Sequence, residues 1–324
     1  MNTAAKHFTN AVSFVAGLLL MLFLISKAVT PAEGTVDNGV DSKDANGILA
    51  EPENSIDLLF VGDSETYSSV IPLELWDKHG FTSYCLSSSA QKLYYAEELI
   101  EAALSRQRPK VVMLETNMLF TKFNFDDSLL HKAGSVLPVF KYHDRWKVLL
   151  DGFMGEETDT SEESEFKGYR LYTKVNPADA AGYMKPSDQK AAIPSRCKSY
   201  LKEIKEYCEE RGAQFILFST PSTKNASYPR HNAITALAKQ LGIEYIDLNT
   251  DKSIKIDWST DTRDRGDHLN YLGAAKATKA IGEHLAKKEL LPDHRGEEAY
   301  SRWDELYKVF TKKVKKALKK AGLS

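Results

Sequence analysis

The stretch IDLLFVGDSE (56–65) decides the fold. Its first six residues form an apolar run that a turn signal closes, which is typical of a buried strand. The stretch then places Ser64 directly after the strand and ahead of a helical segment. Backbone N–H groups at a helix N-terminus favour negative charge, so Ser64 is a candidate nucleophile. On its own Gly-Asp-Ser is a weak signal, because all three residues are common in ordinary turns.

Downstream of this strand, apolar runs alternate with amphipathic segments. Further strands are predicted at 81–86, 111–116, 214–220 and 243–249, and helices at 71–79, 92–107, 199–212, 232–242 and 274–288. Strands that are apolar throughout and separated by helices indicate a parallel sheet buried on both faces. We therefore predict an α/β protein, a three-layer α/β/α sandwich with a parallel sheet.

The N-terminal part of the chain carries the longest apolar run, residues 11–29. Bases precede this run, whereas residues 30–54 hold six acids and one base, a net charge of −5. This asymmetry places the N-terminus in the cytoplasm and the rest of the chain outside. About 19 residues at about 1.5 Å each just span a hydrocarbon core, which favours an uncleaved single-pass anchor in the cell membrane. Small residues at Ser26 and Ala28 leave open a signal peptide cleaved after Ala28.

Composition sets the remaining limits. The 324 residues are 42% apolar, which excludes wholesale disorder. A net charge of −2 gives no overall basicity for binding nucleic acid. Three cysteines without a Cys/His cluster exclude a disulfide framework and a zinc site, and we expect no metal and no cofactor. The predicted domains are an anchor or signal segment (1–29), a flexible linker (30–54), a catalytic domain (55–290) with an insertion (118–190), and a C-terminal helix (291–324).

A second polar motif, DRGDHLN (264–270), follows the last strand and precedes the last core helix. Because the carboxyl ends of parallel strands meet at one edge of a sheet, this motif and Ser64 are expected to converge there. A serine, a histidine and an acid at one edge form a nucleophile–base–orienter arrangement, here in the chain order Ser…Asp…His. The sequence has no GxSxG elbow, which excludes the α/β-hydrolase solution.

These motifs resemble the SGNH/GDSL hydrolase superfamily, whose fold is flavodoxin-like, over most of residues 55–288. The resemblance is closest to a membrane-anchored bacterial branch that works beside membrane-bound O-acyltransferases. That branch includes the D-alanylation protein of teichoic acids and the proteins that acetylate exopolysaccharides such as alginate or cellulose. The segments that carry the resemblance are GDSE (62–65), KYHDRW (141–146) and GDHLNYLGA (266–274).

The resemblance implies Ser64 as nucleophile and His268 as base. The superfamily usually places its acid three residues before the histidine, where this chain has Arg265. Asp264, four residues before, could lie one turn away and orient the ring. Asp267 is adjacent to His268, and side chains of adjacent residues diverge, so we prefer Asp264 to Asp267.

The resemblance also implies an oxyanion hole and a substrate wall. The usual oxyanion glycine is replaced within SSSAQ (87–91), which leaves a backbone amide of Ser89 or Ala90 as the donor. Asn117, in the position of the family's GxND motif, is either a further oxyanion ligand or a residue that fixes its loop. Within the insertion, three residues form either a buried polar anchor or a wall of a sugar or acyl site: His143, Arg145 and Trp146.

Two classes of function follow. The first is an extracytoplasmic serine enzyme that transfers an acyl group, expected to be acetyl, to a cell-surface polysaccharide or hydrolyses it, through an acyl-serine intermediate. The second is a non-catalytic module that binds glycan or scaffolds an acylation complex, which Arg265 at the usual acid position favours. The expected partners are the polysaccharide, a membrane-bound O-acyltransferase and the membrane itself, and nucleic acid is not among them.

The C-terminal segment 299–324 adds a candidate membrane contact. Its apolar residues recur at helical spacing, and residues 301–324 carry a net charge of +6. One interpretation is a terminal helix whose aromatic stripe packs on the domain. The alternative is a basic amphipathic helix that lies on anionic lipid or binds an acidic polymer.

Overall fold

A computed structural model describes residues 3–30, 43–142 and 164–323. The chain divides into two compact units. One unit comprises Met1–Asp41 and Phe123–Glu162, and the other comprises Ser42–Lys122 and Glu163–Ser324. The expected insertion 118–190 is therefore split, because residues 123–162 group with the N-terminal helix and the residues on either side of them with the second unit.

The second unit is built on a five-stranded sheet in which every neighbouring pair of strands is parallel. The strand order is β2-β1-β3-β4-β5. The strands are β1 (Leu58–Gly62), β2 (Ser83–Ser87), β3 (Val111–Glu115), β4 (Gln214–Ser219) and β5 (Glu244–Asp247). Each lies within two residues of its predicted bounds. The parallel arrangement brings all carboxyl ends to one edge, as the alternating pattern predicted.

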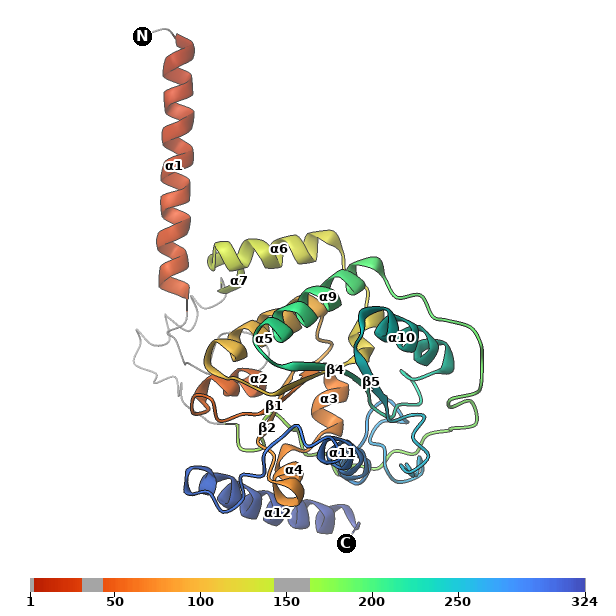
Figure 1. The fold of residues 1–324 in the computed structure, drawn as a ribbon. Helices are drawn as coiled ribbons and strands as arrows, with labels where there is room; N and C mark the ends of the chain where they lie inside the picture. The colour runs from red at the N-terminus through yellow and green to blue at the C-terminus, as the bar shows by residue number, and fades with distance from the viewer. Residues whose placement is uncertain (1–2, 31–42, 143–163, 324) are drawn as a thin grey trace. The chain divides into compact units, whose positions relative to one another are not determined.

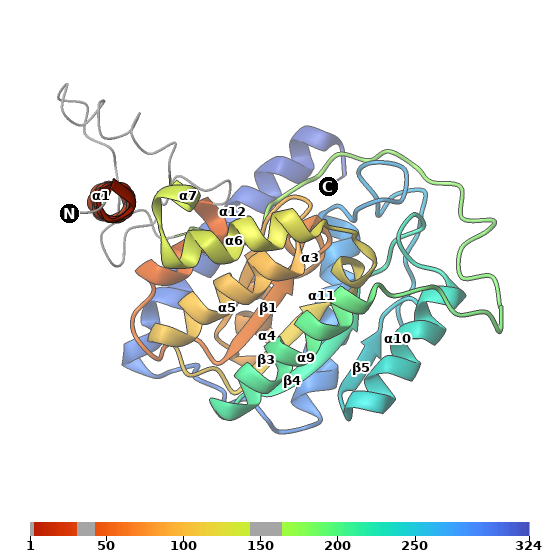
Figure 2. The same cartoon turned by 90° about the horizontal axis from the view of Figure 1, so that it is seen from above.

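Helices cover both faces of this sheet (Figure 1). On one face lie α5 (Leu93–Arg106) and α9 (Ser195–Glu210), which Figure 2 shows from above, and α10 (Tyr228–Leu241) packs beside β5. On the other face lie α4 (Pro72–His79) and α11 (Tyr271–Ala286), and the short α3 (Ser64–Ser69) follows β1. The three-layer α/β/α prediction is confirmed.

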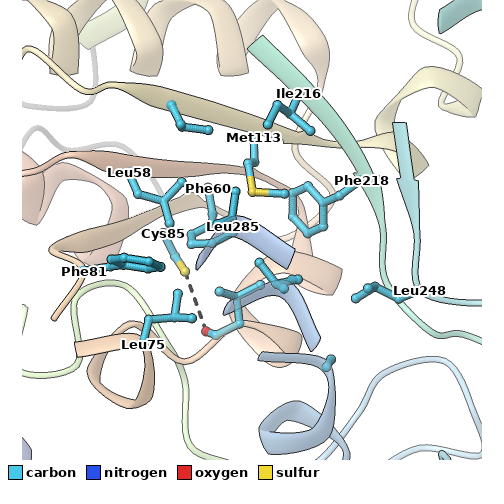
Figure 3. Close-up of a cluster of buried hydrophobic side chains, with 14 of the residues drawn as sticks. Leu58, Phe60, Leu75, Phe81, Cys85, Met113, Ile216, Phe218, Leu248 and Leu285 are labelled. Atoms are coloured by element: carbon cyan, nitrogen blue, oxygen red, sulfur yellow. Dashed lines mark hydrogen bonds between the residues drawn. The ribbon is translucent and has the colours of Figure 1, made fainter. Parts of the chain in front are cut away.

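The core beneath α11 is formed by alternate strand residues (Figure 3). Phe60 of β1 and Phe218 of β4 meet edge to face with ring centres 5.7 Å apart, and Met113 of β3 and Leu285 of α11 belong to the same cluster. All four side chains are fully buried. Burial of each such side chain contributes roughly 1.5–3 kcal/mol, so this cluster is what holds the sheet edge and its loops in place.

Residues 43–51 correct the predicted linker. Instead of belonging to a flexible tether over 30–54, they form α2 (Lys43–Asn46) and a 3-10 turn (Gly47–Ala50) that pack on the second unit. Ala45 and Ile48 are buried, and the backbone carbonyl of Asp44 accepts a hydrogen bond from Tyr84 Oη (2.6 Å). The apolar residues of this short stretch are too few and too irregularly spaced to produce a periodic pattern, which is why the sequence did not reveal this contact.

A buried ion pair closes this segment onto the domain. Lys167 Nζ lies 2.8 Å from both carboxylate oxygens of Glu51, and the two side chains are 1% and 2% exposed. The same ammonium lies 4.9 Å from the ring centre of Trp303 in α12 (Ser301–Ala321). The pair therefore joins three segments that are far apart in the sequence.

Breaking one side of this pair is expected to destabilise the protein strongly. Lys167→Met or Glu51→Leu alone removes an ion-pair partner of a buried charge, and should lower the free energy of unfolding by about 3–5 kcal/mol. The double variant removes both charges and should recover most of that loss. Denaturant unfolding of the full chain in detergent measures all three. Additive losses in the double variant would contradict a direct interaction of the two charges.

The C-terminal helix α12 packs its apolar stripe on the domain, as the first interpretation predicted. Trp303, Leu306, Phe310 and Val314 are buried, and the helix lies against α4. The lysines of residues 308–320 all remain exposed. The aromatic stripe is therefore not available to lipid, and only the lysine side of α12 faces outward.

The first unit is formed by helices. Helix α1 (Thr3–Val29) contains a segment, Ala5–Val29, that is long and apolar enough to cross a membrane by length and composition. The unit also holds α6 (Phe125–Val136) and α7 (Val139–Tyr142), and α7 contacts both α1 and α6.

Candidate active site

Ser64 stands at the carboxyl end of the central strand β1. Gly62 ends the strand, Asp63 caps α3 by accepting a hydrogen bond from Glu65 N (3.0 Å), and Ser64 is the first helical residue. A Cβ on Gly62 would lie 1.9 Å from Thr66 Oγ1, so only glycine lets the chain turn this tightly into the helix. The result is a half-buried hydroxyl held at the sheet edge.

His268 joins Ser64 to Asp264 in one chain of hydrogen bonds. His268 Nε2 lies 2.8 Å from Ser64 Oγ, and His268 Nδ1 lies 2.6 Å from Asp264 Oδ2. The other oxygen of Asp264 accepts a hydrogen bond from the backbone N–H of His268 (2.7 Å). A carboxylate can only accept, so this contact favours the tautomer with its proton on Nδ1 and leaves Nε2 free to accept the serine proton.

A left-handed turn produces the unusual four-residue spacing. Arg265 and Gly266 have φ angles of +66° and +85°, and a Cβ on Gly266 would lie 2.0 Å from Thr223 Oγ1. Across the base of this loop, Thr262 Oγ1 accepts from Gly266 N (2.8 Å) and donates to the carbonyl of His268 (2.9 Å). We expected one helical turn between the acid and the histidine, and the loop achieves the same approach by doubling back.

The choice between the two acids follows from the same geometry. Asp267 Oδ2 lies 3.7 Å from His268 Nδ1, beyond hydrogen-bond distance, whereas Asp264 Oδ2 lies at 2.6 Å. Asp267 Oδ1 instead accepts from Asn225 Nδ2 (2.9 Å). The structure therefore places Asp264 on the histidine, and Arg265 at the usual acid position does not interrupt the chain of hydrogen bonds.

The predicted oxyanion donors lie at the same edge of the sheet. Ser87 pairs with Gly62 in the sheet register, so the exposed turn with Ser89 and Ala90 follows β2 beside the nucleophile strand. Tyr67 Oη of α3 lies 3.1 Å from Ser89 Oγ. Ala90 has a φ of +52°, a conformation that favours glycine.

Asn117 is held by two charged neighbours. Its Nδ2 donates to Asp63 Oδ2 (2.8 Å), and its Oδ1 accepts from Arg230 Nη1 (2.9 Å). An amide NH₂ group has two N–H bonds, so one is committed to Asp63 and one can serve an oxyanion. Asn117 can therefore both fix its loop and serve as an oxyanion ligand. The three residues of the predicted substrate wall, His143, Arg145 and Trp146, lie outside the described residues.

A buried acidic cluster behind Ser64 was not predicted. Asp63, Glu65 and Glu115 are all buried at the ends of β1 and β3. Burial raises the pKa of each carboxyl group, and the mutual repulsion of the three raises the pKa of Glu65 further. Arg230 provides a positive charge beside them, and the same burial lowers the pKa of its guanidinium.

Asn225 connects the two halves of the site. Its Nδ2 donates to Glu65 Oε1 (2.6 Å) and to Asp267 Oδ1 (2.9 Å), which ties the nucleophile segment to the histidine loop. Its backbone carbonyl accepts from Arg230 Nη1 (2.7 Å). The signal for it was present in the sequence, because Asn225 follows β4 and the carboxyl end of that strand meets the same edge.

We expect Glu65 to make stability depend on pH. An acid whose pKa is raised in the folded state binds its proton more tightly there than in the unfolded chain. Its contribution to the free energy of unfolding is therefore complete at acidic pH, and it declines as the pH rises toward the pKa of the folded state. A pKa that is one pH unit higher in the folded state corresponds to about 1.4 kcal/mol of folding free energy. Glu65→Gln should therefore match the wild type near pH 5 and exceed it in melting temperature near pH 8. Parallel pH profiles for the two proteins would contradict a raised pKa.

Metal binding would compete with the hydrogen-bonded chain. Among the described residues, Glu65, Asp267 and His268 place ligand atoms within 4.8 Å of one another. Both ring nitrogens of His268 are, however, already within hydrogen-bond distance of Ser64 and Asp264. The geometry favours proton transfer over metal ligation at this histidine.

Comparison with known proteins finds similarity at the level of structure. No family model and no curated protein sequence matches the chain. Among solved structures, a GDSL-like lipase from Bacteroides thetaiotaomicron is 12% identical (76% of this chain, 99% of that chain, TM-score 0.40). The lipase/acylhydrolase from Enterococcus faecalis is 7% identical (72% and 97%, TM-score 0.40), and a psychrotrophic esterase from Pseudoalteromonas sp. is 10% identical (72% and 98%, TM-score 0.36). Because these scores are low, we derive the chemistry from the geometry of the site itself.

Proposed function

We propose that this protein is a serine-dependent O-acyltransferase or esterase that acts on a cell-surface polysaccharide. The observation that carries the proposal is the hydrogen-bonded chain Ser64–His268–Asp264 at the carboxyl edge of the sheet. A serine is activated toward an ester carbonyl when its hydroxyl is hydrogen-bonded to an imidazole and a carboxylate orients that imidazole.

The reaction proceeds in two steps. Ser64 Oγ attacks the ester carbonyl carbon while His268 Nε2 takes the hydroxyl proton, and the proton then passes to the leaving alcohol as the acyl-serine forms. Asp264 stabilises the imidazolium. In the second step an acceptor hydroxyl gives its proton to His268 Nε2 and attacks the acyl carbon. His268 then returns that proton to Ser64 Oγ as the acyl–Oγ bond breaks, which regenerates Ser64. Backbone N–H groups at Ser64 and at Ser89 or Ala90, together with Asn117, are the proposed oxyanion ligands, each worth about 3 kcal/mol.

Transfer and hydrolysis differ only in the acceptor. The membrane-anchored branch that the motifs resemble favours transfer of an acetyl group to an extracytoplasmic polymer, with a membrane-bound O-acyltransferase as partner. Anchoring through α1 supports this setting, because it would hold the site at the cell surface. Residues 143–146 are proposed to contribute to the sugar or acyl site.

Two measurements on the full chain in detergent test the proposal. A fluorophosphonate should label Ser64, since it reacts with activated serines. With p-nitrophenyl acetate as donor, mass spectrometry should find the acetyl group on an added polysaccharide for a transferase, or as free acetate for an esterase. The absence of both labelling and nitrophenol release would indicate the non-catalytic binding module instead.

We further propose that the lysine side of α12 contacts anionic lipid headgroups. Each exposed lysine near such a surface contributes roughly 1 kcal/mol at modest salt. A fragment comprising residues 42–324, which keeps the Glu51 ion pair, should co-sediment better with phosphatidylglycerol vesicles than with phosphatidylcholine vesicles. Neutralising Lys312, Lys315, Lys316 and Lys319 to glutamine should remove that preference.

The matched control neutralises Lys198 and Lys202 of α9, which are equally exposed. Because exposed charges are screened within about 8 Å at physiological ionic strength, added salt should weaken the preference steeply. A preference that survives loss of the α12 lysines would show that this helix has only a structural role.

A further inference from the structure

Helix α6 exposes large apolar side chains of the kind that a helix on a water-soluble domain normally buries. Three of its large apolar side chains are exposed: Leu129 and Leu130 are 54% and 59% exposed, and Val136 is 78% exposed. Among the side chains of α6 that the structure describes, Ser128 is buried, and so is the backbone at Gly134. A helix that packs on a protein in water normally buries its apolar stripe and exposes the polar one.

The neighbouring α7 connects this surface to α1. The backbone N–H of Val139 donates to Ser26 Oγ (3.1 Å), and both Ser26 and Val29 are buried. The apolar run 11–29 is about 28 Å long along a helix axis. A hydrocarbon core is about 30 Å thick, so a span over this run leaves the core near Val29, three residues beyond Ser26, where α7 is attached.

We infer that the apolar surface of α6, defined by Leu129, Leu130 and Val136, lies in the membrane interface beside the end of α1. This inference rests on the proposed anchoring through α1. Exposed apolar side chains cover α1 along most of its length, and α7, which contacts both α1 and α6, links the exposed apolar residues of α6 to it within the same unit. Burial of such a helix face at the headgroup boundary is how interfacial helices bind bilayers.

Two observations favour lipid over a protein as the occupant. The surface adjoins the point where α1 leaves the hydrocarbon core, a depth at which lipid is always present. Exposed charges also flank it, with Asp126 in the first turn of the helix and Lys132 beside the apolar residues, so that charged groups can reach headgroups while the leucines enter the acyl boundary. An interfacial helix has this combination of an apolar face and a charged rim.

Bimane fluorescence in reconstituted full-length protein tests the inference. Single cysteines replace Leu130 or Val136, with Leu20→Cys in α1 as the bilayer reference and Lys202→Cys in α9 as the aqueous reference. The native Cys85, Cys197 and Cys208 are buried, and unsubstituted protein controls for their labelling. In phosphatidylcholine vesicles, a lipid with a shallow doxyl group should quench the Leu130 and Val136 probes several-fold more than the Lys202 probe, and aqueous iodide should quench them several-fold less.

Each other outcome is decisive. If the Leu20 probe is quenched by lipid while the α6 probes behave like Lys202, the interfacial position is wrong and the anchor stands. If the α6 probes are protected from iodide but not quenched by the doxyl lipid, a protein surface occupies α6 and the inference is overturned. If the Leu20 probe itself escapes lipid quenching, the anchoring fails and the inference fails with it.

Discussion

Replacing Ser64 with alanine is expected to lower the turnover of p-nitrophenyl acetate by at least about 1,000-fold. The substitution removes the only atom that forms the acyl bond, and removal of a serine nucleophile typically leaves no more than the residual rate supplied by the oxyanion donors and binding. The melting temperature should change little, because the hydroxyl is half-buried and its partner, His268, keeps its bond to Asp264.

The same helix provides a matched control. Ser68 lies one turn further along α3, is buried, and its hydroxyl has no hydrogen-bond partner among the described residues. Ser68→Ala should therefore leave turnover unchanged and should not lower the melting temperature. Turnover by Ser64→Ala that equals the wild-type rate would remove Ser64 from the mechanism, whatever the control shows.

Asp264→Asn is expected to lower turnover by about 100- to 10,000-fold, and Asp267→Asn by less than about tenfold. An asparagine at 264 can present an N–H to the ring, which favours the tautomer that carries its proton on Nε2 and cannot accept from Ser64. Asp267 lies beyond hydrogen-bond distance from the ring, so its loss affects mainly the contact with Asn225.

The pH profile separates this role from a purely structural one. Asp264→Asn should remain slow at every pH, while its melting temperature stays close to that of the wild type. The reverse ranking of the two variants would show that Asp267 orients the ring. Equal wild-type rates in both would leave a serine–histidine dyad as the mechanism.

The sheet could be predicted because its signal is local. Runs such as 56–61 and 214–220 are buried on both faces, and burial on both faces leaves a continuous apolar pattern. The convergence of Ser64 with His268 followed from topology alone, since parallel strands share one carboxyl edge. The preference for Asp264 over Asp267 rested on the diverging side chains of adjacent residues, and the observed distances agree with it.

The missed features depend on contacts between distant segments. Glu51 resembled a solvated linker acid until Lys167, 116 residues later, was placed beside it. Asn225 could be placed at the carboxyl edge because it follows β4, but its bonds to Glu65 and Asp267 could not be read from spacing. The same holds for the contact of Arg230 with Asn117, 113 residues earlier. The left-handed turn at Arg265 likewise replaced the helical turn that a spacing of four suggests, because φ cannot be read from spacing.

The Glu51–Lys167 pair also has a mechanical consequence. The chain crosses between the two units near residues 42, 122 and 163, and the ion pair lies just inside the first and last of these crossings. Tension that enters the second unit near residues 42 and 163 would therefore load this buried ion pair, reinforced by Trp303, before it reached the strands. The third crossing, near residue 122, follows seven residues after the end of β3, so the same tension applied there would reach the sheet without passing the ion pair.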